Sequence, residues 1–220
     1  MAEKGWDTRR GADELIASGL VYVNGIQAHV GQQVSAKDLV EIRRGKTIAK
    51  QYSYFAYHKP VGIETKDIVE KLPNEFLKSH SDLFPIGRLD KDSSGLIILT
   101  NDGRVTDRLL NPKFEHEKEY HVSLSKKVSN TLLRAIKEGM KMGSERTKPA
   151  KVRKTSDYSF DIILSEGKNR QIRRMCAAFG YEVKTLERFR IMNITLSRKV
   201  GEIEELNSKT REVFLKDIGL

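Results

Sequence analysis

Short strand-like segments recur along this chain without the evenly spaced helices that a parallel α/β sheet requires. Residues 95–100 have the apolar run of a buried strand, and residues 119–124 alternate apolar and polar side chains as a half-buried strand does. Helical patterns follow at 129–138 and at 169–179, where Gly180 is expected to end the second helix. This order predicts an α+β fold, with a mixed, mainly antiparallel sheet flanked by helices.

The beginning of the chain has the pattern of a separate small unit. Apolar residues at helical spacing within 9–18 predict a helix, and Asn24-Gly25 after a strand at 21–23 predicts a tight turn. A further strand is expected at 39–42. We therefore expect a small N-terminal module at 1–46, a polar linker at 47–52 and a larger domain at 53–220.

Composition bounds the environment of the chain and the chemistry open to it. Of its 220 residues 38% are hydrophobic, which is enough to bury a core without disulfides or metal ions. Its apolar runs fall short of the roughly 18 residues of a membrane span, and residues 1–7 lack the apolar centre of a secretory signal. A soluble, cytoplasmic protein is expected.

The cysteine and histidine residues give no sign of a metal site. Cys176 is the single cysteine, so an internal disulfide and a cysteine-rich zinc site are excluded, and the five histidines show no ligand spacing. Cys176 lies in a helix-like run with apolar neighbours. We interpret it as a packed apolar side chain rather than as a nucleophile.

The chain carries a large excess of positive charge. Lysine and arginine number 40 against 30 acidic residues, which gives a net charge of +10 and a pI of about 9.6. Such an excess favours a polyanionic partner, because each neutralised phosphate releases condensed counterions. A basic surface that serves solubility alone is the other interpretation. The charge suggests nucleic acid as a partner and says nothing of a reaction.

Two segments concentrate the polar residues that could carry chemistry. In the first, glycines bracket a loop that holds Arg88, Asp90 and Asp92 just before the strand at 95–100. Catalytic residues are often placed on loops held by a rigid sheet. Taken alone, however, a charged surface turn is the simpler interpretation of this loop.

The second segment is 165–175, in which three arginines would lie on one side of a helix and apolar residues on the other. Cations and backbone donors close together after Gly167 suit a phosphate. A solvated basic helix face explains the same pattern equally well. The arginines are Arg170, Arg173 and Arg174, and the inward-facing residues are Ile172, Met175 and Cys176.

Four separated motifs resemble the RsuA-type pseudouridine synthase family. They are HKPVG (58–62), GRLDKDSSGLIILTNDG (87–103), HEKEYHV (116–122) and EGKNRQIRRMCAAFGYEV (166–183). A further stretch, LERFRIMNITLS (186–197), resembles the branch of that family that acts on large-subunit ribosomal RNA. The motifs occur in the family's order and span about three quarters of the chain, unlike a lone short motif. The resemblance implies the pseudouridine synthase fold.

The resemblance also implies roles for individual residues. Asp90 would be the nucleophile or base that initiates glycosidic-bond cleavage, with Asp92 as the rival carboxylate. Tyr120 would pack against the flipped uracil and help remove the proton from C5, and Arg173 would pair with Asp90. The residues expected to contact RNA or shape its pocket are Arg88, Lys59, Lys168, Arg170, Gln171, Arg174, Arg9 and Arg10.

The family chemistry needs no cofactor, because uracil is detached, rotated and rejoined through C5 without net redox change. The expected partner is ribosomal RNA, that of the large subunit first, and the expected state is a monomer with no membrane partner. The alternatives are the same reaction on small-subunit ribosomal RNA or transfer RNA, and a non-catalytic RNA-binding assembly factor.

The N-terminal unit resembles the small RNA-binding module of ribosomal protein S-four type. The resemblance lies in RRGAD (9–13) and VYVNG (21–25). That module usually has another helix before the paired arginines, and residues 1–7 do not look like one. The expectation is therefore an incomplete module, or a remnant that only packs against the catalytic domain.

Overall fold

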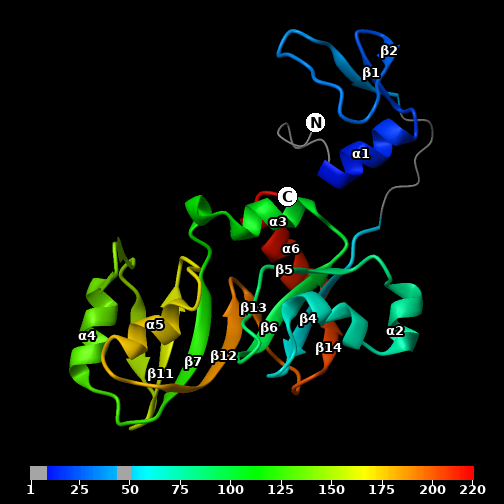
Figure 1. Ribbon diagram of the computed structural model, residues 1–220. Coiled ribbons are helices and arrows are strands. Elements are labelled where there is room, and N and C mark those ends of the chain that lie inside the picture. Colours follow the sequence, from blue (N-terminus) through cyan, green and yellow to red (C-terminus); the bar gives the residue numbers. More distant parts are fainter. Residues whose placement is uncertain (1–8, 44–50) are drawn as a thin grey trace. The chain divides into compact units, whose positions relative to one another are not determined.

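The computed structural model describes residues 9–43 and 51–220. The chain divides into two compact units, Met1–Tyr52 and Ser53–Leu220 (Figure 1). The predicted linker at 47–52 falls largely on residues outside the described ranges.

The smaller unit contains one helix and a three-stranded antiparallel sheet of order β2-β1-β3. Val21 and Val23 of β1 point into a small core, against which Leu15 and Ile16 of the helix pack. The expected turn follows β1, where Asn24 adopts a positive φ of 51°. The elements are α1 (Arg9–Ala17), β1 (Val21–Val23), β2 (Ile26–Gln27) and β3 (Val40–Ile42).

The larger unit is built on a nine-stranded sheet, which confirms the predicted α+β fold. Its central order is β10-β11-β7-β12-β6-β4-β14, with β13 paired to β12 and β5 paired to β6. Neighbours are antiparallel except β12 and β6, which run parallel. The strands are β4 (Tyr54–Lys59), β5 (Phe84–Ile86), β6 (Ser94–Thr100), β7 (Lys118–Leu124), β10 (Lys151–Lys154), β11 (Ser159–Leu164), β12 (Val183–Ile191), β13 (Ile194–Thr195) and β14 (Ile203–Glu205).

Helices flank this sheet, as the sequence predicts. Ser129 caps α4 by accepting a hydrogen bond from the backbone N–H of Leu132. In α5 the apolar residues Ile172, Met175 and Cys176 are buried in the core, which confirms the predicted inward face. The helices are α2 (Asn74–Ser79), α3 (Arg104–Leu110), α4 (Asn130–Glu138), α5 (Gln171–Ala177) and α6 (Ser208–Asp217), with short 3₁₀ turns at Thr65–Asp67, Val69–Lys71 and Pro112–Phe114 and a hairpin of β8 (Lys141–Met142) and β9 (Glu145–Arg146).

The parallel seam between β6 and β12 joins two antiparallel halves of the sheet. It is short, with Ser94 opposite Glu187 and Gly95 opposite Arg188. A Cβ at Gly95 would lie 2.2 Å from the backbone oxygen of Arg188, and Gly95 has φ +115°. Only glycine satisfies both conditions, so this residue sets how closely the two halves approach. The polar loop before β6 therefore ends directly at the seam.

Candidate active site

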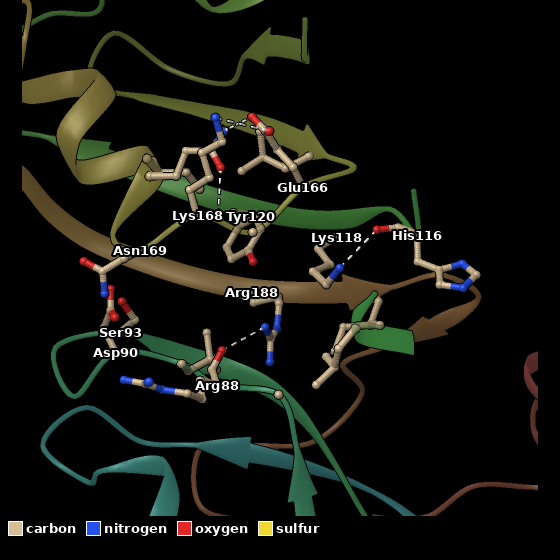
Figure 2. A pocket seen from close by; sticks show the side chains of 18 of the residues that line it. Arg88, Asp90, Ser93, His116, Lys118, Tyr120, Glu166, Lys168, Asn169 and Arg188 are labelled. Atoms are coloured by element: carbon tan, nitrogen blue, oxygen red, sulfur yellow. Dashed lines mark hydrogen bonds and ion pairs between the residues drawn. The ribbon is translucent and has the colours of Figure 1, made fainter. Parts of the chain in front are cut away.

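A pocket of about 420 Å³ opens over the seam and gathers residues from both halves of the sheet. Asp90 reaches it from the loop before β6, Tyr120 from β7 and Arg188 from β12 (Figure 2). The loop between β11 and α5 closes another side with Lys168 and Arg170. The structure thus brings Asp90 and Tyr120 to one cavity, as the family resemblance implies.

The loop that carries Asp90 is fixed by hydrogen bonds from separate elements. Thr65 Oγ1 donates to the Leu89 carbonyl at 2.8 Å and accepts from the Leu89 N–H at 3.0 Å. The Gly62 N–H donates to the Lys91 carbonyl at 2.7 Å, and the Asp90 carbonyl accepts from the Ser93 N–H at 3.0 Å. Asp90 is therefore held on a preorganised turn rather than on a free surface loop.

Arg170 is the arginine nearest to the Asp90 carboxylate. Its Nη1 lies 3.6 Å from Asp90 Oδ2, and the Asp90 side chain keeps 26% of its surface exposed. Arg170 also binds Asp92 through two hydrogen bonds of 2.9 and 2.8 Å. These hydrogen bonds, with the nearby charge of Arg173, hold the pKa of Asp92 below its ordinary value although burial opposes them. Asp92 thus serves as an anchor for arginines.

The expected ion pair between Arg173 and Asp90 is not what the structure shows. Arg173 Nη2 donates to the Asp92 carbonyl at 2.8 Å, Nη1 donates to the Val183 carbonyl at 3.0 Å, and Nε lies 3.3 Å from Asp92 Oδ2. The reason is where α5 begins. Arg170 precedes the helix in a left-handed conformation with φ 47°, which turns it toward Asp90. Arg173 lies inside the helix and reaches the backbone of the loop.

Tyr120 has two cationic neighbours on the pocket face of the sheet. Arg188 is its partner across the β7–β12 pairing, and Lys118 lies two residues before it on the same face of β7. Arg188 donates from Nε to the Leu96 carbonyl at 2.8 Å and from Nη1 to the Arg88 carbonyl at 3.3 Å. Neither cation was predicted from the sequence. The alternation of 118, 120 and 122 is the signal that would have placed Lys118 on this face.

Several residues predicted to bind RNA have other contacts in the structure. Lys59 is fully buried, and its Nζ donates to the carbonyls of Pro60 and Ile63 at 2.8 Å each. Burial is the main cause of its lowered pKa. Gln171 is also buried and donates to Glu166 at 2.6 Å. These two side chains hold their loops in shape and are not placed as RNA ligands.

The other predicted contacts differ in position. Arg88 lines the pocket, and so does Lys168, which donates to the Arg146 carbonyl at 3.0 Å. Arg174 does not line this pocket; its Nη1 lies 3.4 Å from the Asn169 carbonyl. The side chains of Arg9 and Arg10 lie outside the described part of the chain.

The structure also bears on a thiol nucleophile, on a metal site and on a membrane span. Burial raises the pKa of the Cys176 thiol to about 12, which keeps it protonated and argues against a nucleophilic role. Residues 9–43 and 51–220 contain no cluster of three or more potential metal-ligating His, Cys, Asp or Glu side chains. Within the same ranges, no helix has the length and apolar character needed to cross a membrane.

Comparisons with known proteins identify the family of this chain. Residues 53–178 match the family described as RNA pseudouridylate synthase. The chain is 43% identical over 213 residues to the dual-specificity RNA pseudouridine synthase RluF of Escherichia coli K12, covering 94% of this chain and 73% of that protein. It is 36% identical over 199 residues to ribosomal large subunit pseudouridine synthase B of Bacillus subtilis 168, covering 86% of this chain and 82% of that protein.

A solved structure extends the likeness to three dimensions. A crystal structure described as pseudouridylate synthase superposes with a TM-score of 0.72 and 31% sequence identity, covering 97% of this chain and 96% of that chain. Motifs, fold and sequence identity therefore agree. The chain belongs to the RNA pseudouridylate synthase family, in the RsuA-type branch that contains RluF and RluB.

Proposed function

We propose that this protein converts a specific uridine of large-subunit ribosomal RNA to pseudouridine, with Asp90 as the catalytic carboxylate. The observation that carries the proposal is the shared pocket of Asp90 and Tyr120 over the seam of the sheet. The name of the B. subtilis relative refers to the large ribosomal subunit, which supports that RNA as the substrate. The net charge of +10 suits the same partner.

The reaction requires the target base to leave the RNA stack. A stacked uridine cannot reach Asp90 within the pocket, so the nucleotide must flip out, at a cost of about a few kcal/mol. The C1′–N1 bond then breaks, and its electron pair stays on the uracil. The base rotates and rejoins C1′ through C5, while the hydrogen of C5 leaves as a proton and N1 gains one. The atoms and electrons balance without a cofactor.

The carboxylate of Asp90 starts this sequence as a nucleophile or base. As a nucleophile, it would attack either C6 of the uracil ring or C1′ of the ribose. Arg170 gives it a cationic neighbour at 3.6 Å, and Tyr120 supplies an aromatic surface on which the detached base can pack. The fixed turn around residues 89–93 supports catalysis by holding Asp90 in one position.

The N-terminal unit is proposed to bind structured RNA outside the pocket. Its pattern resembles the ribosomal protein S-four type module, and the predicted division at 1–46, 47–52 and 53–220 assigns it to a domain of its own. The pocket residues all belong to Ser53–Leu220. The N-terminal unit would therefore affect which RNA is bound, and the larger unit would perform the reaction.

Release of tritium from RNA labelled at C5 of uridine tests the function. The wild type is expected to release tritium from large-subunit ribosomal RNA. Asp90→Asn should slow release by more than about 10³-fold, because an amide cannot replace the ionised carboxylate. RNA binding should be kept. Asp157→Asn, a carboxylate-to-amide change at an exposed residue bound to Lys127 and Lys154, is the matched control and should behave as wild type.

The same assay on small-subunit ribosomal RNA and transfer RNA separates the alternatives. Release from only one of these RNAs would change the proposed substrate to that RNA and leave the proposed reaction unchanged. Equal release by wild type and Asp90→Asn would discard Asp90 as the catalytic residue. Binding without release from every RNA class would favour a non-catalytic assembly factor.

A further inference from the structure

The proposed roles of Asp90, Tyr120 and Arg170 leave two cations of the pocket, Lys118 and Arg188, without a function. Lys118 and Arg188 lie on adjacent strands, where Lys118 is opposite Ile191 and Arg188 is opposite Tyr120. Both side chains line the same cavity as Tyr120 and Asp90. In the view of Figure 2, Lys118 and Arg188 enter the space beside the Tyr120 ring, and Asp90 enters from the other side of that ring.

Arg188 has a hydrogen-bond donor that the protein leaves unused. Its side chain is almost completely buried, with 4% of the residue exposed. Nε and Nη1 donate to the carbonyls of Leu96 and Arg88, but Nη2 is buried and has no hydrogen-bond partner within the described part of the chain. A buried donor without a partner costs about 1–3 kcal/mol, so a native structure that retains one requires an explanation.

Lys118 adds a second charge beside this donor. Its Nζ donates to the His116 carbonyl at 3.2 Å, and no ion pair joins Lys118 to a carboxylate among the described residues. Burial, and then the charge of Arg188, lower its pKa to about 8. Two neighbouring cations in a partly desolvated pocket, with no carboxylate paired to Lys118 or Arg188 among the described residues, are unfavourable unless the pocket receives an anion.

We propose that Lys118 and Arg188 form a subsite for the uracil anion that exists between bond cleavage and bond formation. The inference rests on the proposed function. When C1′–N1 breaks, the electron pair spreads over N1, O2 and O4 of the base. Positive charge fixed in advance next to these atoms stabilises the developing anion more than it stabilises neutral uridine. Re-addition through C5 to C1′ then consumes the anion.

Burial favours the base over a backbone phosphate as the occupant. A phosphate remains joined to the sugar chain on both sides, so it is suited to the partly exposed cations at the pocket mouth, such as Arg170 with 44% of its side chain exposed. Arg188 is too deeply buried for that. An everted base is the part of the RNA that can enter the pocket, and Tyr120 lies next to both cations to receive it.

Lys118→Met tests the subsite by removing the charge and keeping the length of the side chain. The rate of tritium release at saturating large-subunit ribosomal RNA should fall by about 10²–10³-fold, the usual effect of removing one group that stabilises a transition-state anion. The Kd for the RNA should change by less than about threefold. Lys184→Met, on exposed Lys184 of β12, is the matched control and should match wild type.

Thermal stability separates catalysis from a structural role. Lys118→Met removes a desolvated cation that is not paired with a carboxylate, so its Tm should equal or exceed that of the wild type. A structural lysine would give a lower Tm together with lower activity. Lys118→Arg should restore a large part of the rate, because it restores the charge.

The pH profile gives an independent readout. Lys118 is charged below its pKa of about 8, so kcat/KM of the wild type should fall as pH rises through 8, and Lys118→Arg should keep its kcat/KM there. His116 does not produce this limb, because burial lowers its pKa from 6.5. The charged and titratable groups that line the pocket are Arg88, Asp90, His116, Lys118, Tyr120, Glu166, Lys168, Arg170 and Arg188.

The outcomes distinguish this inference from the function on which it rests. If the wild type released no tritium from any RNA, both proposals would fall. If the wild type and Lys118→Met released tritium equally, only the anion subsite would be overturned. Weaker RNA binding by Lys118→Met with an unchanged rate at saturation would also overturn it, and would assign Lys118 to a phosphate.

Discussion

Around Asp90, two arginines three positions apart contact different parts of one loop. Arg170 binds side chains, with its guanidinium on Asp92 and 3.6 Å from Asp90. Arg173 binds the backbone at the Asp92 carbonyl and ties the loop to Val183 at the start of β12. One arginine therefore acts on the charge of the site and the other on its position.

Replacing each arginine by alanine should separate these effects. Arg173→Ala removes hydrogen bonds of a side chain that is only 13% exposed, so we expect a loss of about 1–3 kcal/mol in unfolding free energy and lower activity. Arg170→Ala should lower activity and leave stability nearly unchanged, because exposed ion pairs contribute about 0–1 kcal/mol.

Urea unfolding and tritium release measure the two quantities. The reverse pattern, with stability lost in Arg170→Ala and kept in Arg173→Ala, would contradict the roles given to these arginines.

The sequence identified the loop and the tyrosine but not every contact between residues. The family resemblance implied that Asp90 and Tyr120 share one pocket, and the structure places both residues in its lining. The partner of Asp90 was assigned wrongly, since a shift of three residues depends on where α5 begins. Arg188 could not be found, because its role requires the register of β12 against β7.

At the scale of elements, Gly95 decides whether β6 and β12 can meet. Gly95→Ala should lower the unfolding free energy by about 3 kcal/mol, because the new Cβ would collide with the Arg188 backbone and φ is +115°. Activity should fall with it, since the same strands carry Arg188 and the end of the catalytic loop.

Gly143→Ala is the control for backbone conformation alone. Gly143 has φ +65°, and a Cβ added there would meet no atom within 4 Å, so the cost should be limited to about 1 kcal/mol. Equal denaturant midpoints for the two variants would show that the close approach of Gly95 to the Arg188 backbone does not contribute to the free energy of unfolding.

The elements of the sheet centre were easier to predict than those at its edge. β6 and β7 have long apolar or alternating runs, and α4 and α5 have clear apolar faces. β14 has three residues, and α6 was not anticipated because its amphipathic pattern is weak, with Phe214 its buried residue. The parallel pairing of β12 with β6 joins residues more than 90 positions apart, which no local pattern reveals.

At the scale of the molecule, the proposed reaction and the proposed RNA docking belong to different units. A chain of residues 53–220 alone should unfold cooperatively, because the described contacts of Asp90, Tyr120 and Arg188 lie within it. We expect its kcat to stay near that of the full chain and its KM for ribosomal RNA to rise by about 10-fold or more. Steady-state tritium release measures both constants. A lower kcat with an unchanged KM would instead show that the N-terminal unit contributes to the chemical step.

The short parallel seam has a consequence for the free and RNA-bound enzyme. The strand pairing between the two halves of the sheet is short there, with two registered pairs in the described chain, and residues of both halves line the pocket. A nucleotide bound between Asp90 on one half and Tyr120 on the other would add contacts that link the two halves across the β6–β12 pairing. Part of the binding free energy for RNA would then stabilise the sheet against local opening. The sheet would open less often in the RNA-bound enzyme than in the free enzyme.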